Sequence, residues 1–187
     1  MSVAVAVRKG RRIVMAADSL TTFGGHRQIN RNAVTMKIRR VGSALVSCSG
    51  WALYDNILDD FLTTKRLPAL TDKQSIFRFF LKLWAALEDK YLLVNQQCSE
   101  KDSPFGDLDA TFLVANRKGI FKVSSDASVS EFQEYAAIGS GGDYAYGAMH
   151  CLYDEERNPR TIAQRAVEAG IEFDAYCGGE VLVHEVK

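Results

Sequence analysis

The sequence predicts an α+β fold of four layers, an αββα sandwich in which two packed sheets lie between two pairs of helices. Two apolar hairpins, over 3–17 and 110–123, stand far apart in the chain, which favours two sheets that face one another. The helical patterns come in pairs after groups of strands and do not alternate with single strands. This order argues against a doubly wound parallel sheet.

Short apolar runs mark the strands. Valines alternate with alanines over 3–7, a turn follows at 8–11, and the run 13–17 returns as a second strand. Three further strands are predicted at 110–115, 120–123 and 180–186.

The first pair of helices follows from apolar residues spaced at i, i+3 and i+4. This spacing predicts one helix over about 51–65. Thr71 and Gln74 have the spacing of a capping box, and a broad apolar stripe follows them. We therefore expect the second helix to begin there.

The second pair lies near the end of the chain. A Gly-rich turn at 139–142 leads into one helix, and Asn158 and Pro159 open the other as its N-cap and first helical residue. The polar segment 96–107, between the two halves of the chain, is predicted as a loop.

Composition excludes several classes of protein. The chain has 187 residues, with 23 basic and 23 acidic side chains, which fits one domain over 1–187. Zero net charge argues against a nucleic acid or an anionic membrane as partner. No apolar run is long enough to span a bilayer, and the first residues do not form a signal peptide. We expect a soluble, cytoplasmic domain.

The usual catalytic and metal-binding motifs are missing. The chain has no G-x-S-x-G, Walker A, H-E-x-x-H or C-x-x-C motif, and its three His are scattered. Its four Cys have no paired spacing, so neither a disulfide framework nor a zinc ribbon is indicated. We therefore expect no metal, no cofactor and no classical triad.

Ser2 offers a different route to catalysis. Its small side chain favours removal of Met1, and a terminal Ser carries its own base. The reference pKa of a free α-amine is about 7.7–8.0, so the amine can accept the hydroxyl proton. Met-Ser is also a common start to a chain, so this feature alone indicates little.

Four segments of the sequence support the interpretation of Ser2 as a nucleophile. They are Val-Met-Ala-Ala-Asp-Ser (14–19), Thr-Phe-Gly (22–24), Met-Lys-Ile-Arg-Arg-Val (36–41) and Ala-Ile-Gly-Ser-Gly-Gly-Asp-Tyr-Ala (137–145). Together they resemble the proteasome β-subunit superfamily of N-terminal-nucleophile hydrolases, and the HslV-type bacterial peptidases in particular. The resemblance extends from Ser2 to the final strand, and it implies the four-layer sandwich of that superfamily.

The resemblance also implies roles for single residues. Ser2 stands where the family has its N-terminal Thr nucleophile, and Lys37 matches the lysine beside it. A buried ammonium there lowers the pKa of the α-amine and keeps it able to act as a base. Asp18 matches the acid that holds this lysine, and Thr22 matches a residue that aligns the substrate backbone.

A second group supports the chain terminus. Ser140 matches a serine that hydrogen-bonds near the terminal amine, although it also fits a helix cap. Asp174 and Cys177 match an Asp-x-x-Ser pair, so Asp174 would orient the terminus and Ser140. Because Cys177 stands where Ser is usual, a small packed side chain is the alternative interpretation. By position, Ser47 replaces the glycine whose N–H stabilises the oxyanion, so the Ser47 N–H would receive the oxyanion, although the added side chain could crowd the substrate.

The function implied is that of an endopeptidase that hydrolyses peptide bonds inside a homo-oligomeric double ring of six or seven subunits per ring. Its substrates would be peptides or unfolded proteins. The family also implies a ring-shaped ATP-dependent unfoldase as partner, but no residue of the sequence identifies a docking site.

Two alternatives stay open. One is a proteasome-like ring that has lost activity and has a structural or binding role, which Ser47 or a retained Met1 would favour. The other is an N-terminal-nucleophile amidohydrolase that acts on a small amide, which a deep, closed pocket would favour.

Overall fold

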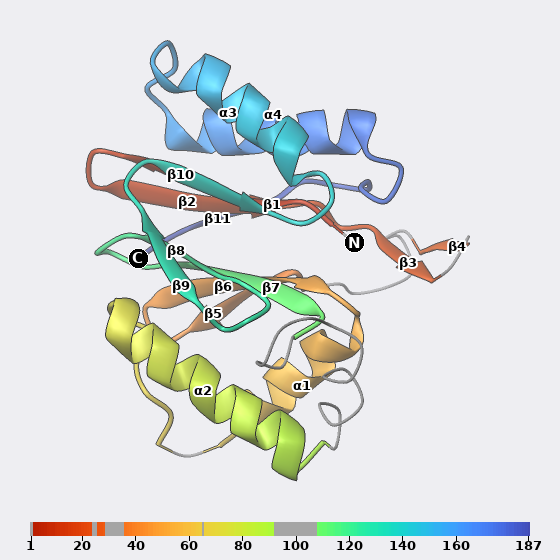
Figure 1. Ribbon diagram of the computed structural model, residues 1–187. Coiled ribbons are helices and arrows are strands. Elements are labelled where there is room, and N and C mark those ends of the chain that lie inside the picture. The colour runs from red at the N-terminus through yellow and green to blue at the C-terminus, as the bar shows by residue number, and fades with distance from the viewer. Residues whose placement is uncertain (1, 24–25, 29–35, 65, 92–107) are drawn as a thin grey trace.

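Two antiparallel sheets pack face to face between two pairs of helices, and the predicted four-layer αββα fold is confirmed (Figure 1). The computed structural model describes residues 2–23, 26–28, 36–64, 66–91 and 108–187. The predicted loop at 96–107 lies outside these residues.

The first sheet has the strand order β10-β1-β2-β11 and is covered on its outer face by α3 and α4 (Figure 1). Its hairpin and its sequence-distant edge strands are joined by antiparallel pairing. The elements are β1 (Ala4–Lys9), β2 (Arg12–Ala17), β10 (Tyr135–Ile138), β11 (Leu182–Glu185), α3 (Gly142–Tyr153) and α4 (Pro159–Phe173).

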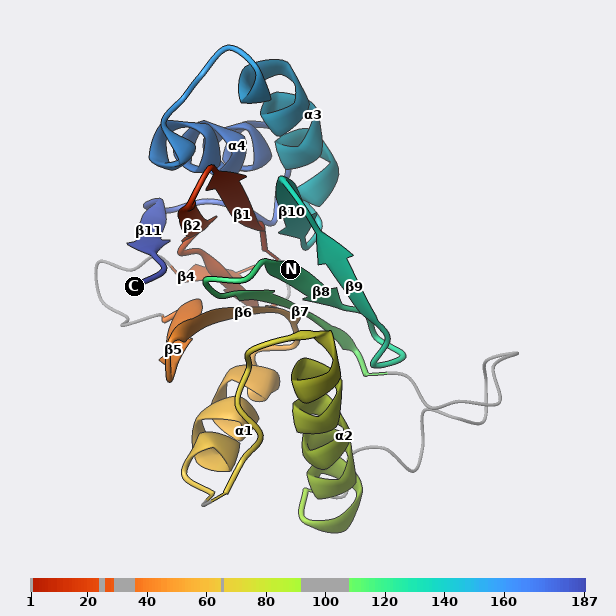
Figure 2. The same ribbon diagram turned by 90° about the vertical axis from the view of Figure 1, so that its left-hand side faces the viewer.

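The second sheet has the order β5-β6-β7-β8-β9 and carries α1 and α2 on its opposite face (Figure 2). A separate ribbon of β3 and β4 projects beside the first residues of the chain (Figure 1). The elements are β3 (Thr21–Phe23), β4 (His26–Gln28), β5 (Ile38–Val41), β6 (Ala44–Gly50), β7 (Ala110–Ala115), β8 (Ile120–Val123), β9 (Val129–Phe132), α1 (Leu53–Leu62) and α2 (Lys73–Asp89).

Strand alternation divides the core into three clusters. Along β1 the valines point toward α3 and α4, whereas Ala4 and Ala6 face the second sheet. Aromatic side chains fill the space between the second sheet and its helices, with Phe79, Phe80 and Phe112 fully buried. Along β1, the small alanines therefore lie between the sheets, and the valines lie under α3 and α4.

Two-residue turns close the hairpins that matter for the site. Gly10 joins β1 to β2 and Gly42 joins β5 to β6, each with φ of +59° at the first turn position. A positive φ followed by a negative one is the pattern of a type II′ turn, which favours glycine first. These turns fix the register of both strand pairs.

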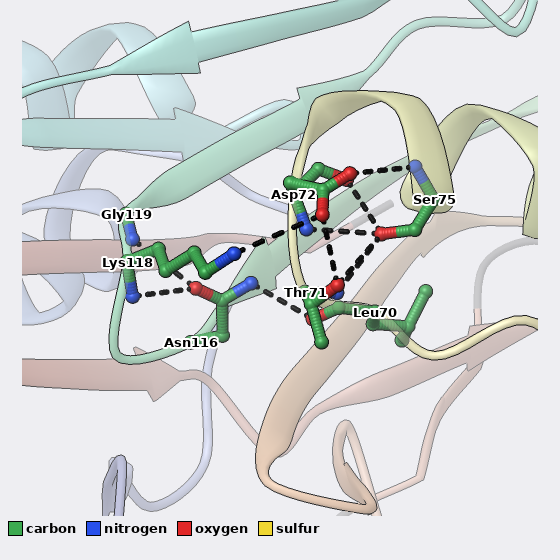
Figure 3. Close-up of polar contacts among 7 residues, drawn as sticks. All are labelled: Leu70, Thr71, Asp72, Ser75, Asn116, Lys118 and Gly119. Carbon is green, nitrogen blue, oxygen red and sulfur yellow. Dashed lines mark hydrogen bonds and ion pairs between the residues drawn. The ribbon is translucent and has the colours of Figure 1, made fainter.

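The start of α2 differs from the sequence prediction by one residue. Asp72, not Thr71, is the N-cap, and it exchanges hydrogen bonds with Ser75 rather than Gln74 (Figure 3). Thr71 instead uses its hydroxyl to contact both of these side chains.

Beside this helix start, the buried Asn116 side chain ties the β7–β8 turn to the preceding loop. Its amide donates to the Leu70 carbonyl, and its oxygen accepts from the N–H groups of Lys118 and Gly119 (Figure 3). The second sheet and the start of α2 are therefore held together by polar bonds as well as by packing.

The other predicted elements are present with small changes in their ends. Asn158 caps α4 with Pro159 in its first turn, as predicted. The last strand, β11, is shorter than the predicted 180–186. None of the described helices has the length and hydropathy needed to cross a membrane.

Candidate active site

Ser2, Lys37 and Asp18 lie together at one edge of the space between the sheets. The Lys37 ammonium donates to the Ser2 hydroxyl at 2.9 Å and to Asp18 Oδ1 at 2.8 Å. Ser2 is 8% exposed, Lys37 5% and Asp18 0%. The structure therefore brings three of the sequence-predicted site residues into one buried chain of contacts.

Asp18 is held by donors from three parts of the chain. Besides Lys37, the N–H of Val3 donates to its Oδ1 at 3.0 Å and the N–H of Gly178 to its Oδ2 at 3.1 Å. These bonds replace the hydration that a buried carboxylate loses. Since Val3 follows Ser2 directly, the same carboxylate fixes both the backbone beside Ser2 and the ammonium at its hydroxyl.

The turn before α3 holds the other side of Ser2. The Gly141 N–H donates to the Ser2 carbonyl at 3.3 Å. Gly139 passes so close that a Cβ at that position would lie 2.0 Å from the same oxygen, and its φ is +93°. Both the close approach and the positive φ require glycine there.

Ser140 and Asp174 form a supporting pair next to this turn. Partial burial raises the pKa of the Asp174 carboxyl, but hydrogen bonds from Ser140, the Tyr176 N–H and Cys177 outweigh it and hold the pKa below its usual range. Burial and two nearby carboxylates raise the pKa of the Cys177 thiol to about 12, so it keeps its proton and donates to Asp174 Oδ2 at 3.4 Å. The Cys177 thiol thus makes a hydrogen bond to Asp174, a role that the replacement of Ser by Cys had left in doubt.

One cavity adjoins the nucleophile candidate, and a second lies next to the first. The smaller, of about 40 Å³, is lined by Ser2 and Lys37 together with Cys48 and Asp55. The larger, of about 990 Å³, lies between the β3 strand and the start of α1. Thr22 and Gly50 are among the residues that line both cavities.

Ser47 lies apart from both. Its side chain is 1% exposed, and its hydroxyl has no hydrogen-bond partner among the described residues. It lines neither of the two cavities, so its side chain does not crowd this space.

The β5–β6 register bears on the backbone donor. Residues that flank a two-residue turn form a hydrogen-bonded pair, and the pairs then alternate. Counted from the turn, the pair of Ile38 with Ser47 is not hydrogen-bonded, so the Ser47 N–H points to β7. The Cys48 N–H points the opposite way, toward the Lys37 carbonyl, where it completes the pairing of β6 with β5. The Gly50 N–H, two residues on, has the same direction but lies beyond the end of β5, and Gly50 lines both cavities.

An ion-pair cluster beside this cavity was not predicted from the sequence. The Arg39 side chain, 7% exposed, pairs with both Asp55 and Asp59 of α1. The signal for it was available, because Arg39 stands on the face of β5 that carries buried apolar residues on neighbouring strands. A cation on such a face needs an acidic partner.

The described residues show no arrangement of three His, Cys, Asp or Glu side chains that could hold a metal ion. Cys48 and Cys177 are buried free thiols, whereas Cys151 is exposed. The chemistry supported by this geometry is that of a hydroxyl nucleophile beside an ammonium.

Known proteins resemble this chain over nearly its full length. No model of a known protein family matches it. It is 27% identical over 186 residues to the ATP-dependent protease subunit HslV of Caldicellulosiruptor saccharolyticus, covering 97% of this chain and 96% of that protein. Eukaryotic HslV from Trypanosoma brucei shares its fold, with a TM-score of 0.69 at 17% identity over 98% of each chain.

Higher identity is found with Thiobacillus denitrificans BPH. Its structure in complex with epoxomicin matches with a TM-score of 0.88 at 33% identity, covering 99% of both chains. A second structure of Thiobacillus denitrificans BPH matches with a TM-score of 0.87 at 32% identity, covering 99% of this chain and 98% of the other.

The glycine turn gives a direct test of the site geometry. We expect Gly139→Ala to lower the free energy of unfolding by more than about 2 kcal/mol, because the added Cβ meets the Ser2 carbonyl at a strained φ. Gly142→Ala is the matched control, since its Cβ would make only ordinary contacts near 3.8 Å. Urea denaturation of both variants measures the difference. Equal stability of the two variants would show that the turn does not hold Ser2.

Proposed function

Because this chain belongs to the proteasome β-subunit and HslV-like family of N-terminal-nucleophile hydrolases, we propose that it is a peptidase whose nucleophile is the Ser2 hydroxyl. The observation that carries the proposal is the buried contact of the Lys37 ammonium with both Ser2 and Asp18. A lysine held in this way costs desolvation energy, which a purely structural serine would not require.

Removal of Met1 gives Ser2 a free α-amine. The amine accepts the hydroxyl proton as Oγ attacks the scissile carbonyl, and an ester to Ser2 forms. The proton then passes to the leaving amine as the C–N bond breaks. Water, activated by the same amine, hydrolyses the ester and releases the acyl product.

Lys37 supports this cycle by its charge. An ammonium 2.9 Å from Oγ stabilises the oxygen as it loses its proton, and it disfavours a second positive charge on the nearby amine. The amine therefore stays neutral and able to act as a base. Asp18 keeps the ammonium in place and offsets its burial.

We assign the oxyanion donor to the N–H of Gly50 instead of Ser47. The alternating register commits the Ser47 N–H to β7 and turns the Gly50 N–H away from β7, beyond the end of β5, on the side of the cavity that Ser2 and Gly50 both line. A donor fixed in a strand needs no rearrangement when charge develops on the substrate oxygen.

Assembly into rings completes the proposal. Members of this family form homo-oligomeric rings, and we propose a double ring for this chain. Exposed apolar side chains on the α2 surface, Phe77 and Leu81, are candidates for contacts between subunits. Native mass spectrometry distinguishes six from seven subunits per ring and shows whether a ring-shaped ATP-dependent unfoldase co-purifies.

Intact mass spectrometry tests the nucleophile. We expect the purified protein to lack Met1 and to gain one epoxomicin per chain. Ser2→Ala keeps a small residue after Met1, so Met1 is still removed, but the adduct should disappear because the hydroxyl is gone. Ser2→Thr should retain it.

A quantitatively retained Met1 would contradict the mechanism and favour a ring with a structural role. An adduct that persists in Ser2→Ala would place the nucleophile elsewhere. Cleavage of small amides but of no peptide would favour an amidohydrolase.

A further inference from the structure

Asp55 lies where it can contact a side chain of the substrate. It is in the first turn of α1 and lines the same small cavity as Ser2. The residue whose carbonyl Ser2 attacks must place its own side chain next to Ser2, and this cavity is the adjoining space. Among the charged side chains of α1, Asp55 is therefore the one that lines the cavity next to Ser2.

Arg39 leaves part of the Asp55 carboxylate available. The guanidinium makes a two-pronged contact with Asp59 and gives Asp55 Oδ1 a single bond of 2.7 Å. None of the described residues donates a hydrogen bond to Asp55 Oδ2. The carboxylates of Asp55 and Asp59 thus share the buried Arg39 cation. Asp55, which lines the cavity, keeps one carboxylate oxygen available to accept a hydrogen bond from a substrate.

The surroundings strengthen any bond to that oxygen. Burial raises the pKa of the Asp55 carboxyl above its usual range, and Asp59 raises it further, while the cations of Arg39 and Lys37 only partly offset this. A carboxylate with so little hydration gains more from an incoming donor than an exposed one, and it repels an incoming anion more strongly.

The cavity also limits size. Its volume of about 40 Å³ exceeds what a single water needs but leaves no room for a long side chain. Trp51 and Ala52, before α1, form part of its wall.

Building on the proposed function, we propose that Asp55 makes this cavity select a short side chain with a hydrogen-bond donor, such as Thr or Ser, at the residue whose carbonyl Ser2 attacks, and reject Asp and Glu there. The substrate class is then peptides cleaved after short hydroxylated residues. Asp55 acts as a specificity-determining residue.

Isosteric substrates separate the two parts of the proposal. The substrates are peptide amides of a fluorescent amine that differ only in the residue whose carbonyl Ser2 attacks. Thr and Val are compared to test the hydrogen-bond donor, Asn and Asp to test the charge, and Leu is included to test size. For the wild-type protein we expect kcat/KM to favour Thr over Val and Asn over Asp by about tenfold or more each, and Leu to be cleaved more slowly than Thr.

Two variants, each of which removes one of the carboxylates that pair with Arg39, test the role of Asp55. In Asp55→Asn, Arg39 holds the side-chain oxygen and turns the amide donor toward the cavity, so the Asn-to-Asp ratio should fall toward one. Asp59→Asn also removes a carboxylate from Arg39, but its side chain is 55% exposed and lies outside the cavity lining, so the ratio should be retained.

Each result decides the matter. Equal cleavage of Thr and Val peptides by the wild-type protein, faster cleavage of the Leu peptide, or equal effects of Asp55→Asn and Asp59→Asn would overturn the selectivity while leaving the peptidase intact. Cleavage of none of the peptides would overturn the proposed function, and this inference with it. The wild-type ratios decide even if Asp55→Asn fails to fold.

Discussion

The buried carboxylate of Asp18 holds together three segments that are distant in the sequence. It accepts from the Val3 N–H, the Lys37 ammonium and the Gly178 N–H, and it is fully buried. An unpaired charge there would be very costly, so the folded state requires these partners to be in place. The position of Ser2 relative to Lys37 therefore follows from the same interaction that closes this end of the sandwich.

Chain ends are usually mobile, and the nucleophile that we propose at residue 2 needs to be fixed. The backbone around Ser2 is bound on both sides, by Asp18 at the next N–H and by the Gly141 N–H at its own carbonyl. Gly139 allows the turn to approach this carbonyl closely. The site thus combines a terminal residue with the rigidity of an interior one, which preorganised catalysis requires.

The sequence alone predicted the hairpins, the paired helices and, through family resemblance, the central triad of contacts. What it did not settle is local. Both Thr71 and Asp72 are good N-caps, so pattern alone could not distinguish them. Successive residues of a strand turn their N–H groups to opposite sides, so proposing Gly50 in place of Ser47 as the oxyanion donor required the register of β6 against β5 and β7. Arg39 was overlooked because its partners lie on a helix whose orientation the sequence does not fix.

The central claim is that the Lys37 ammonium activates Ser2. Its most direct test is the single-turnover rate of Ser2 acylation by a peptide amide in Lys37→Met, a change that keeps the buried apolar stem and removes the charge. The account predicts a loss of at least about 100-fold in a variant whose near-UV circular dichroism is native. A folded Lys37→Met protein that acylates at nearly the wild-type rate would contradict it.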